Sequence, residues 1–239
     1  FEDDFVWPQP ELDAKRAASR KQMIEIAEIC LGIHYDTEPL IVGTSGRYEF
    51  KNKGLDVFVD SLLKLSESAS LPRPVLAYVT VPAGNLGPRK DLQAHLKDPG
   101  SPIDPTVIRN LTHYLSAPEW DPIIGRIKNS RLQDPSCPVQ LIFVPSYLNG
   151  NDVTVFASYY EPWGYTPLES IAFSVPTITT SLTGFGQWVA EKLDEHKGVD
   201  VISRNDTNDS EVVEKISAVL ARFSMMNAAE YDTYRASAL

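Results

Sequence analysis

Residues 156–186 read FASYYEPWGYTPLESIAFSVPTITTSLTGFG, and we interpret the rest of the chain as arranged around this stretch. It opens on the end of an apolar strand at 153–157 and continues into an aromatic loop that contains glycine and proline. A helix follows, and then a second short strand at 176–181. A strand that passes through a loop into a helix and a further strand is the repeating unit of a parallel α/β sheet.

The helix in this stretch is expected to begin with Thr166 as N-cap, Pro167 at the first helical position and Glu169 at the third. The first amides of a helix have no intrahelical acceptor, and the helix dipole favours negative charge beside them. We therefore expect a phosphate to bind near Gly164, Tyr165 and Thr166.

The rest of the chain alternates in the same way between apolar strands and amphipathic helices. Strands are expected at 39–42, 75–81, 139–144 and 198–203. Helices are expected at 13–31, after Gly54, near 105–115, 121–132 and 185–194, over 212–223, and at 228–238. Residues 82–104 are expected to form a long loop. The pattern predicts an α/β fold, a Rossmann-like doubly wound parallel sheet of about six strands with helices on both faces.

The chain is expected to divide into residues 1–36, a linker and helix packed on the domain, and residues 37–239, the Rossmann-like domain itself. A globular protein rarely begins FEDDFVW, so we expect the chain to be a piece of something longer. The connection from 144 to 153 is short for a parallel crossover, which needs about ten residues or more. Either Asn149-Gly150 turns a hairpin between antiparallel strands, or residues are missing there. We favour missing residues, because the remaining pattern is parallel.

The composition excludes several classes of protein. A net charge of -10 argues against nucleic acid as the main partner, because phosphate backbones require a basic face. No apolar run approaches the length of about 18 residues that spans a membrane, and no signal peptide opens the chain. Cys30 and Cys137 have no paired spacing and are interpreted as reduced thiols, so we expect a cytoplasmic protein.

Two cations stand in the glycine-flanked loop after the strand at 39–42. Arg47 and Lys53 together can clamp a diphosphate, the arginine through two parallel hydrogen bonds and the lysine as a point charge. The alternative is a solvated loop in which Glu49 pairs with one of them. The histidines show no metal-ligand spacing and no paired aspartates lie near the loop, so no metal is expected.

Two carboxylates flank the central loop. Glu161, at a strand end, can hold sugar hydroxyls or stabilise a developing oxocarbenium ion, and its alternative is a carboxylate in water. Glu169 can accept both hydroxyls of a ribose from a buried position one turn into the helix, or it can close a capping box with Thr166. Of the loop aromatics, Trp163 and Tyr165 can stack on a sugar or base. Tyr147 is a further candidate for base stacking.

Three motifs closely resemble the glycogen synthases of glycosyltransferase family 3. They are residues 44–54 (TSGRYEFKNKG), residues 158–166 (SYYEPWGYT) with the pair Glu161 and Glu169, and residues 179–186 (TTSLTGFG). The resemblance spans most of residues 37–225. It implies the carboxyl-terminal, donor-binding Rossmann domain of a two-domain GT-B enzyme. Such an enzyme transfers glucose, with retention, from UDP-glucose to the non-reducing end of an α-1,4-glucan.

The resemblance also implies roles for the site residues. Arg47 and Lys53 hold the donor diphosphate with the amides around Tyr165 and Thr166, and Glu161 faces the glucose as the catalytic carboxylate. The remaining donor-binding residues are Tyr147 at the base, Glu169 at the ribose, Trp163 and Gly164. The glucan acceptor would meet an amino-terminal domain that this chain lacks, so the chain alone is expected to be inactive. No cofactor is expected, and a homo-oligomer is allowed.

The sequence departs from the family in two places. A helical segment that carries part of the base pocket has no counterpart after Tyr147, which leaves the choice between UDP-glucose and ADP-glucose open. The arginine-rich helix that senses glucose 6-phosphate in eukaryotic members is missing as well, so no such regulation is expected. A stand-alone nucleotide-sugar-binding module without turnover remains an alternative function.

Overall fold

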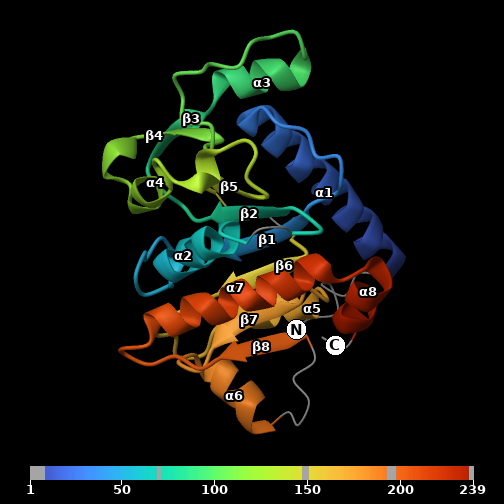
Figure 1. The fold of residues 1–239 in the computed structure, drawn as a ribbon, viewed down its shortest axis with the longest axis vertical. Helices are drawn as coiled ribbons and strands as arrows, with labels where there is room; N and C mark the ends of the chain where they lie inside the picture. Colours follow the sequence, from blue (N-terminus) through green and yellow to red (C-terminus); the bar gives the residue numbers. More distant parts are fainter. Residues whose placement is uncertain (1–8, 69–70, 147–150, 193–197, 237–239) are drawn as a thin grey trace.

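The computed structural model describes residues 9–68, 71–146, 151–192 and 198–236 and contains one large parallel sheet (Figure 1). Its six strands lie in the order β5-β2-β1-β6-β7-β8. Every pairing between neighbours is parallel. Their bounds are β1 Leu40–Ser45, β2 Val75–Thr80, β5 Val139–Val144, β6 Val153–Phe156, β7 Thr177–Thr180 and β8 Val199–Ile202. Counted along the chain, this is the Rossmann order 3-2-1-4-5-6, which confirms the predicted fold class.

The strands are apolar on both faces because helices cover both. On β1, Leu40 and Val42 pack into the cluster that contains α2 and α7, whereas Ile41 packs into the cluster beneath α1. A strand buried on both sides shows no alternation of polar and apolar residues, which is why the sequence pattern identified these strands directly.

The part of the chain that the structure describes forms eight α-helices, which cover both faces of the sheet. Helices α2, α4 and α7 pack on one face, and Figure 1 shows α2 and α7 in front of the sheet. Helix α1 packs on the other face, where α5 and α6 form a separate cluster with β8. Their bounds are α1 Gln9–Leu31, α2 Leu55–Ser66, α3 Lys90–Lys97, α4 Pro122–Ile127, α5 Tyr165–Ala172, α6 Gly184–Lys192, α7 Asp209–Met225 and α8 Ala228–Ala236.

The structure of the segment between β2 and β5 differs from three predictions. The expected loop at 82–104 contains strand β3 (Asn85–Pro88) and helix α3. The helix expected near 105–115 is wrong, because this part ends in strand β4 (His113–Leu115), which pairs antiparallel with β3. The helix expected over 121–132 is reduced to α4 and a 3-10 turn, Arg131–Gln133.

The helix at 105–115 fails because the backbone there pairs with the edge of the main sheet. The amide of Phe143 donates to the carbonyl of Asn110 at 2.7 Å, and the Asn110 side chain donates to the carbonyl of Leu141 at 2.8 Å. Pairing with β5 satisfies an edge strand that is otherwise open, and this tertiary gain exceeds the local preference for helix. Leu111 is accordingly buried.

The short connection before β6 is also clarified. Strand β6 pairs parallel to β1, with Val42 opposite Val153, and β1 and β5 both pair parallel to β2. Strands β5 and β6 therefore run in the same direction, so the alternative of a hairpin between antiparallel strands at Asn149-Gly150 is wrong. Residues 147–150 themselves, and with them Tyr147, lie outside the described residues.

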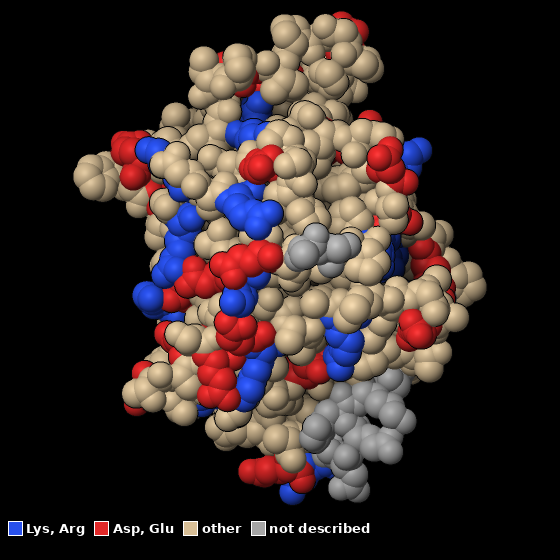
Figure 2. All heavy atoms as spheres, in the orientation of Figure 1, with Lys and Arg blue, Asp and Glu red and all other residues tan. Residues whose placement is uncertain are grey.

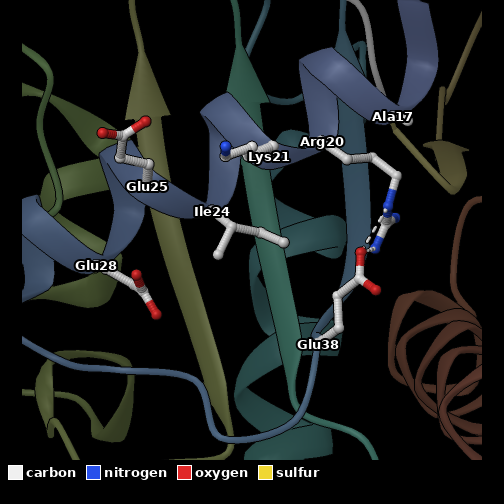
Figure 3. Close-up of a pocket in the computed structure, with 7 residues that line it drawn as sticks. All are labelled: Ala17, Arg20, Lys21, Ile24, Glu25, Glu28 and Glu38. Atoms are coloured by element: carbon white, nitrogen blue, oxygen red, sulfur yellow. Dashed lines mark hydrogen bonds and ion pairs between the residues drawn. The ribbon is translucent and has the colours of Figure 1, made fainter. Parts of the chain in front are cut away.

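Charged side chains join the elements at the amino edge of the sheet. Asp152 is buried, accepts from the amide of Ile41 at 2.9 Å, and pairs with Arg20 of α1 and with Arg73. Arg20 also reaches Glu38, and both line a groove of about 600 Å³ along α1 (Figure 3). This groove lies at the opposite edge from the one where parallel sheets bind ligands.

The face formed by α2 and α7 carries interleaved charges of both signs (Figure 2). Lys64 lies 3.3 Å from Glu67 and 3.1 Å from Glu214, and Lys215 pairs with Glu211 at 2.6 Å. Nucleic-acid binding requires a basic stripe, and this face does not supply one.

Two glycines with left-handed backbone provide a matched test of packing. Gly54 (φ 64°) precedes α2, and a Cβ there would overlap the carbonyl oxygen of Ala157, whereas Gly32 (φ 62°) has open space around it. We predict that Gly32→Ala lowers the free energy of unfolding by about 1 kcal/mol, through backbone strain alone. Gly54→Ala should lower it by about 3 kcal/mol or more, because overpacking is added. Urea denaturation measures both, and equal losses would contradict the close approach.

The amino-edge cluster gives a second stability prediction. Asp152→Ala leaves Arg20, Arg73 and an amide without their buried acceptor, so the free energy of unfolding should fall by about 3 kcal/mol. Glu38→Ala, which removes the exposed partner of the same Arg20, should cost less than about 1 kcal/mol. If Asp152→Ala unfolds at the wild-type urea concentration, α1 is not tied to the sheet in this way.

Candidate functional site

Three segments meet in one hollow at the carboxyl ends of β1 and β6. The loop after β1 contributes Gly46 and Lys53, the loop after β6 contributes Glu161, and the amino end of α5 contributes Gly164 and Thr166. In an open α/β sheet, ligands bind outside the carboxyl ends of the strands, where the strand order reverses. Strands β1 and β6 are the neighbours at that reversal.

The loop after β1 is held by its own backbone. The amide of Lys53 donates to the carbonyl of Glu49 at 2.8 Å, and the amide of Gly54 donates to Lys51 at 3.0 Å. Gly54 has no Cβ, so it can adopt the left-handed conformation of the turn into α2, and its backbone can contact that of Ala157. Lys53, the residue before this contact, is thereby brought next to the loop that follows β6.

The loop after β6 is fixed against the start of α6. The carbonyl of Glu161 accepts from the amide of Gly184 at 3.1 Å, and the carbonyl of Trp163 accepts from Phe185 at 2.7 Å. The Trp163 ring lies edge-on to Phe185, with centroids 6.3 Å apart, and tilts against Trp188 at 6.4 Å. The ring of Trp163 therefore packs under the loop, while its backbone shapes the path from Glu161 to α5.

Helix α5 begins two residues earlier than its sequence suggests. Its first residue is Tyr165, and its N-cap is Gly164 with φ 102°, so the prediction of Thr166 as N-cap is wrong. A left-handed residue at this position is strongly favoured by glycine, which outweighs the threonine signal. The amides of Tyr165 and Thr166 fall within the first turn, where a helix has no internal acceptor for them. The Tyr165 side chain is exposed.

Lys53 and Glu161 form an ion pair across the hollow. Their side chains are only 15% and 23% exposed, so the pair is partly shielded from water. The two groups come from different loops and lie 108 residues apart in the chain. The pair shows that the lysine loop and the glutamate loop converge on one space.

Arg47 and Glu169 do not line the hollow. The Arg47 side chain is 70% exposed and pairs with Glu49 at 3.0 Å, which is the solvated alternative considered for this loop. Glu169 is exposed on α5, so the expectation of a buried carboxylate is wrong. Both side chains are exposed to solvent, outside the hollow that Lys53 and Glu161 line.

Sequence reasoning missed Asp121, which supports the lysine loop. Asp121 caps α4 by accepting from the amides of Ile123 and Ile124, and it also accepts from the Tyr48 hydroxyl at 2.8 Å. Burial and this hydrogen bond raise the pKa of Tyr48. Aspartate before Pro122 is a recognisable start of a helix, but nothing in the sequence linked it to Tyr48.

Two negative findings concern the described residues only. No three His, Cys, Asp or Glu side chains among them are grouped closely enough to hold a metal ion. None of the helices they form is long and apolar enough to cross a membrane. Cys30 and Cys137 are both buried and free.

Comparison with known proteins identifies relatives. The chain is similar to the glycogen [starch] synthase of Neurospora crassa, 28% identical over 265 positions that cover 80% of this chain and 38% of that protein. The Caenorhabditis elegans enzyme is 29% identical over 250 positions, covering 75% and 37%. The chain thus spans less than two fifths of the length of these relatives. Both alignments are longer than the chain's 239 residues, so the relatives carry internal segments that this chain lacks.

A solved structure gives a weaker likeness. The glycosyltransferase WaaG, involved in lipopolysaccharide biosynthesis, superposes with a TM-score of 0.43 and 17% identity over 90% of this chain and 46% of that chain.

The sequence also matches the model of a whole family. The sequence model described as "Glycogen synthase" matches residues 105–235, more than half of the chain. The matched range contains the loop with Glu161 and the start of α5, and it ends in α8. The chain therefore belongs to the glycogen synthase family.

Proposed function

We propose that this chain is the donor-binding half of a glycogen synthase that transfers glucose, with retention, from UDP-glucose to the non-reducing end of an α-1,4-glucan. The observation that carries the proposal is the hollow shared by Lys53, Glu161 and the amino end of α5. A cation and a helix amino end suit the diphosphate, and a carboxylate suits the hydroxyls of the sugar. The matches to glycogen synthases support glucose as the sugar and a glucan as the acceptor.

The diphosphate is assigned to Lys53 and the first amides of α5. Lysine provides a point charge, and the amides of Gly164 to Thr166 provide directed donors with the positive end of the helix dipole behind them. Arg47 is assigned to the same diphosphate from the surface, after leaving Glu49. With these donors, the negative charge on the departing UDP is stabilised by protein groups, and no metal ion is required.

Glu161 is assigned to the glucose. When the diphosphate takes Lys53 as its partner, the carboxylate of Glu161 is released from the ion pair and faces the adjoining sugar. A negative charge there stabilises an oxocarbenium-like transition state and accepts hydrogen bonds from sugar hydroxyls. Glu169, about one turn into α5, is assigned to the ribose.

The acceptor is assigned to the rest of the protein. This chain spans 38% of the Neurospora relative, so a second half that holds the glucan is consistent with the length of these enzymes. The choice of uridine over adenine rests on the motifs that resemble glycogen synthases, and the acceptor cleft is assigned to the rest of the protein.

The first prediction concerns the lysine. Lys53→Ala removes a partly buried cation from the diphosphate, so the affinity for UDP should fall about 10- to 100-fold. Lys51→Ala is the matched control: this lysine lies in the same loop, is exposed, and pairs with Asp56, so its loss should leave affinity unchanged. Arg47→Ala should have a smaller effect than Lys53→Ala. Calorimetry with UDP and with ADP measures all of these and the base preference.

The result that would contradict this site is wild-type affinity for UDP in Lys53→Ala. Failure of the wild-type chain to bind either diphosphate would reject both the enzyme and the binding-module interpretations.

The second prediction is that substitutions of the two glutamates change the affinity for UDP in opposite directions. Glu161→Gln removes the carboxylate that competes for Lys53, so UDP should bind more tightly, by about 3- to 10-fold. Glu169→Gln weakens a ribose contact and should bind UDP less tightly. In the full-length protein, Glu161→Gln should abolish transfer of labelled glucose from UDP-glucose to glycogen. Weaker UDP binding by Glu161→Gln, or retained transfer, would contradict its assigned role.

A further inference from the structure

Arg204 is a buried cation that lies close to the candidate site without entering it. It follows the end of β8 by two residues, and its side chain is 2% exposed. One guanidinium nitrogen donates to the carbonyl of Ala157, and the other donates to Asp209 at 2.9 Å. The guanidinium carbon lies 5.2 Å from the ring centroid of Tyr159. Arg204 therefore touches the backbone and the ring of the loop after β6.

The carbonyl that Arg204 holds is the one on which the lysine loop closes. The backbone of Gly54 approaches Ala157 so closely that a Cβ would overlap this same oxygen. One carbonyl thus joins three elements: the end of β6, the turn that carries Lys53, and the segment after β8. A shift of Ala157 would move Lys53 and the glutamate loop relative to each other.

Two further hydrogen bonds hold the residues next to Ala157. The hydroxyl of Thr180 donates to the carbonyl of Ser158 at 2.7 Å, and the amide of Tyr159 donates to the carbonyl of Asn52 at 2.8 Å. Only Tyr160 lies between this anchored segment and Glu161. The position of Glu161 is therefore set by contacts from β7, from β8 and from the lysine loop.

The burial of a charged group here requires an explanation. A buried guanidinium is costly unless it is paired and hydrogen-bonded, and an apolar side chain would fill the same space at lower cost. Asp209 supplies the opposite charge, and the Tyr159 ring covers the cation. What an apolar residue cannot supply is the donor to the Ala157 carbonyl, and a buried backbone carbonyl without a hydrogen-bond partner is costly.

We propose that Arg204 is a positioning residue of the donor site: through the Ala157 carbonyl and the Tyr159 ring it holds the loop after β6, so that Glu161 and Lys53 meet in one hollow. This inference rests on the proposed function. Arg204 does not contact the donor, unlike Lys53, and its effect on binding is transmitted entirely through the backbone of residues 157–159.

The test compares Arg204 with Arg89, a buried arginine remote from the site. Arg89 is fully buried and bonds to Asp91 and to the carbonyl of Leu111. UDP affinity is measured by calorimetry at a temperature well below the melting point of each variant. Arg204→Ala should weaken UDP binding about 10-fold or more, and Arg204→Lys, which keeps one donor, should recover part of the loss. Arg89→Ala should retain wild-type affinity even where its melting temperature falls as far.

A milder pair of variants covers the case in which Arg204→Ala does not fold. Tyr159→Ala removes the ring from the guanidinium and should weaken UDP binding about 3-fold, whereas Tyr159→Phe keeps the ring and should bind as the wild type does. In the full-length protein, Arg204→Lys should lower kcat more than it raises KM, because the misplaced Glu161 acts mainly in the transition state.

The outcomes separate this inference from the function on which it rests. If the wild-type chain binds no UDP, the proposed function fails, and the role of Arg204 fails with it. If the wild type binds UDP and both Arg204→Ala and Tyr159→Ala bind it equally well, the positioning role alone is overturned. The same conclusion follows if Arg89→Ala weakens binding as much as Arg204→Ala.

Discussion

The parallel pairing of β1 with β6 is the constraint on which the candidate site depends. The chain proceeds from β1 through β2 to β5 on one side of this pair, and from β6 through β7 to β8 on the other. The loops after the two strands therefore separate and leave a crevice between them. The backbone contact between Gly54 and Ala157 limits how far they separate. Lys53 and Glu161, on the two sides of that contact, can then reach the same space.

Three cations near the crevice differ in burial, and this difference suggests a division of roles. Lys53 is partly buried and already paired with Glu161, so the lysine stays paired when a diphosphate takes the place of the glutamate. Arg47 is exposed and loses little by leaving Glu49. Arg204 is buried behind the loop and holds backbone rather than ligand.

The sheet was predictable from the sequence, and the segment between β2 and β5 was not. Strands such as Val139–Val144 are apolar on both faces, which is a local signal that survives folding. Residues 105–115 show a helical pattern, but their structure is decided by the open edge of β5, a neighbour that no local window contains. The start of α5 also differs from the prediction. Gly164 takes a left-handed conformation and is the N-cap, two residues before the threonine that was expected to cap the helix.

The site was predictable to the extent that its residues lie in continuous motifs. Lys53, Glu161 and Gly164 were identified because each follows a strand end. Arg204 carries no local signal, since its role arises from a carbonyl 47 residues earlier in the chain. Glu169 was expected to be buried, but it is exposed. The helical pattern identifies the apolar side of α5, but it does not specify how deeply a polar residue on another side is buried.

The amino end of α5 and the lysine loop are expected to bind one diphosphate between them. This can be measured by titrating the isotopically labelled chain with UDP and following its amide NMR signals. We expect saturable shifts for the amides of Gly164, Tyr165 and Thr166, together with those of residues 46–54. Shifts confined to the groove along α1, or none at all, would contradict it.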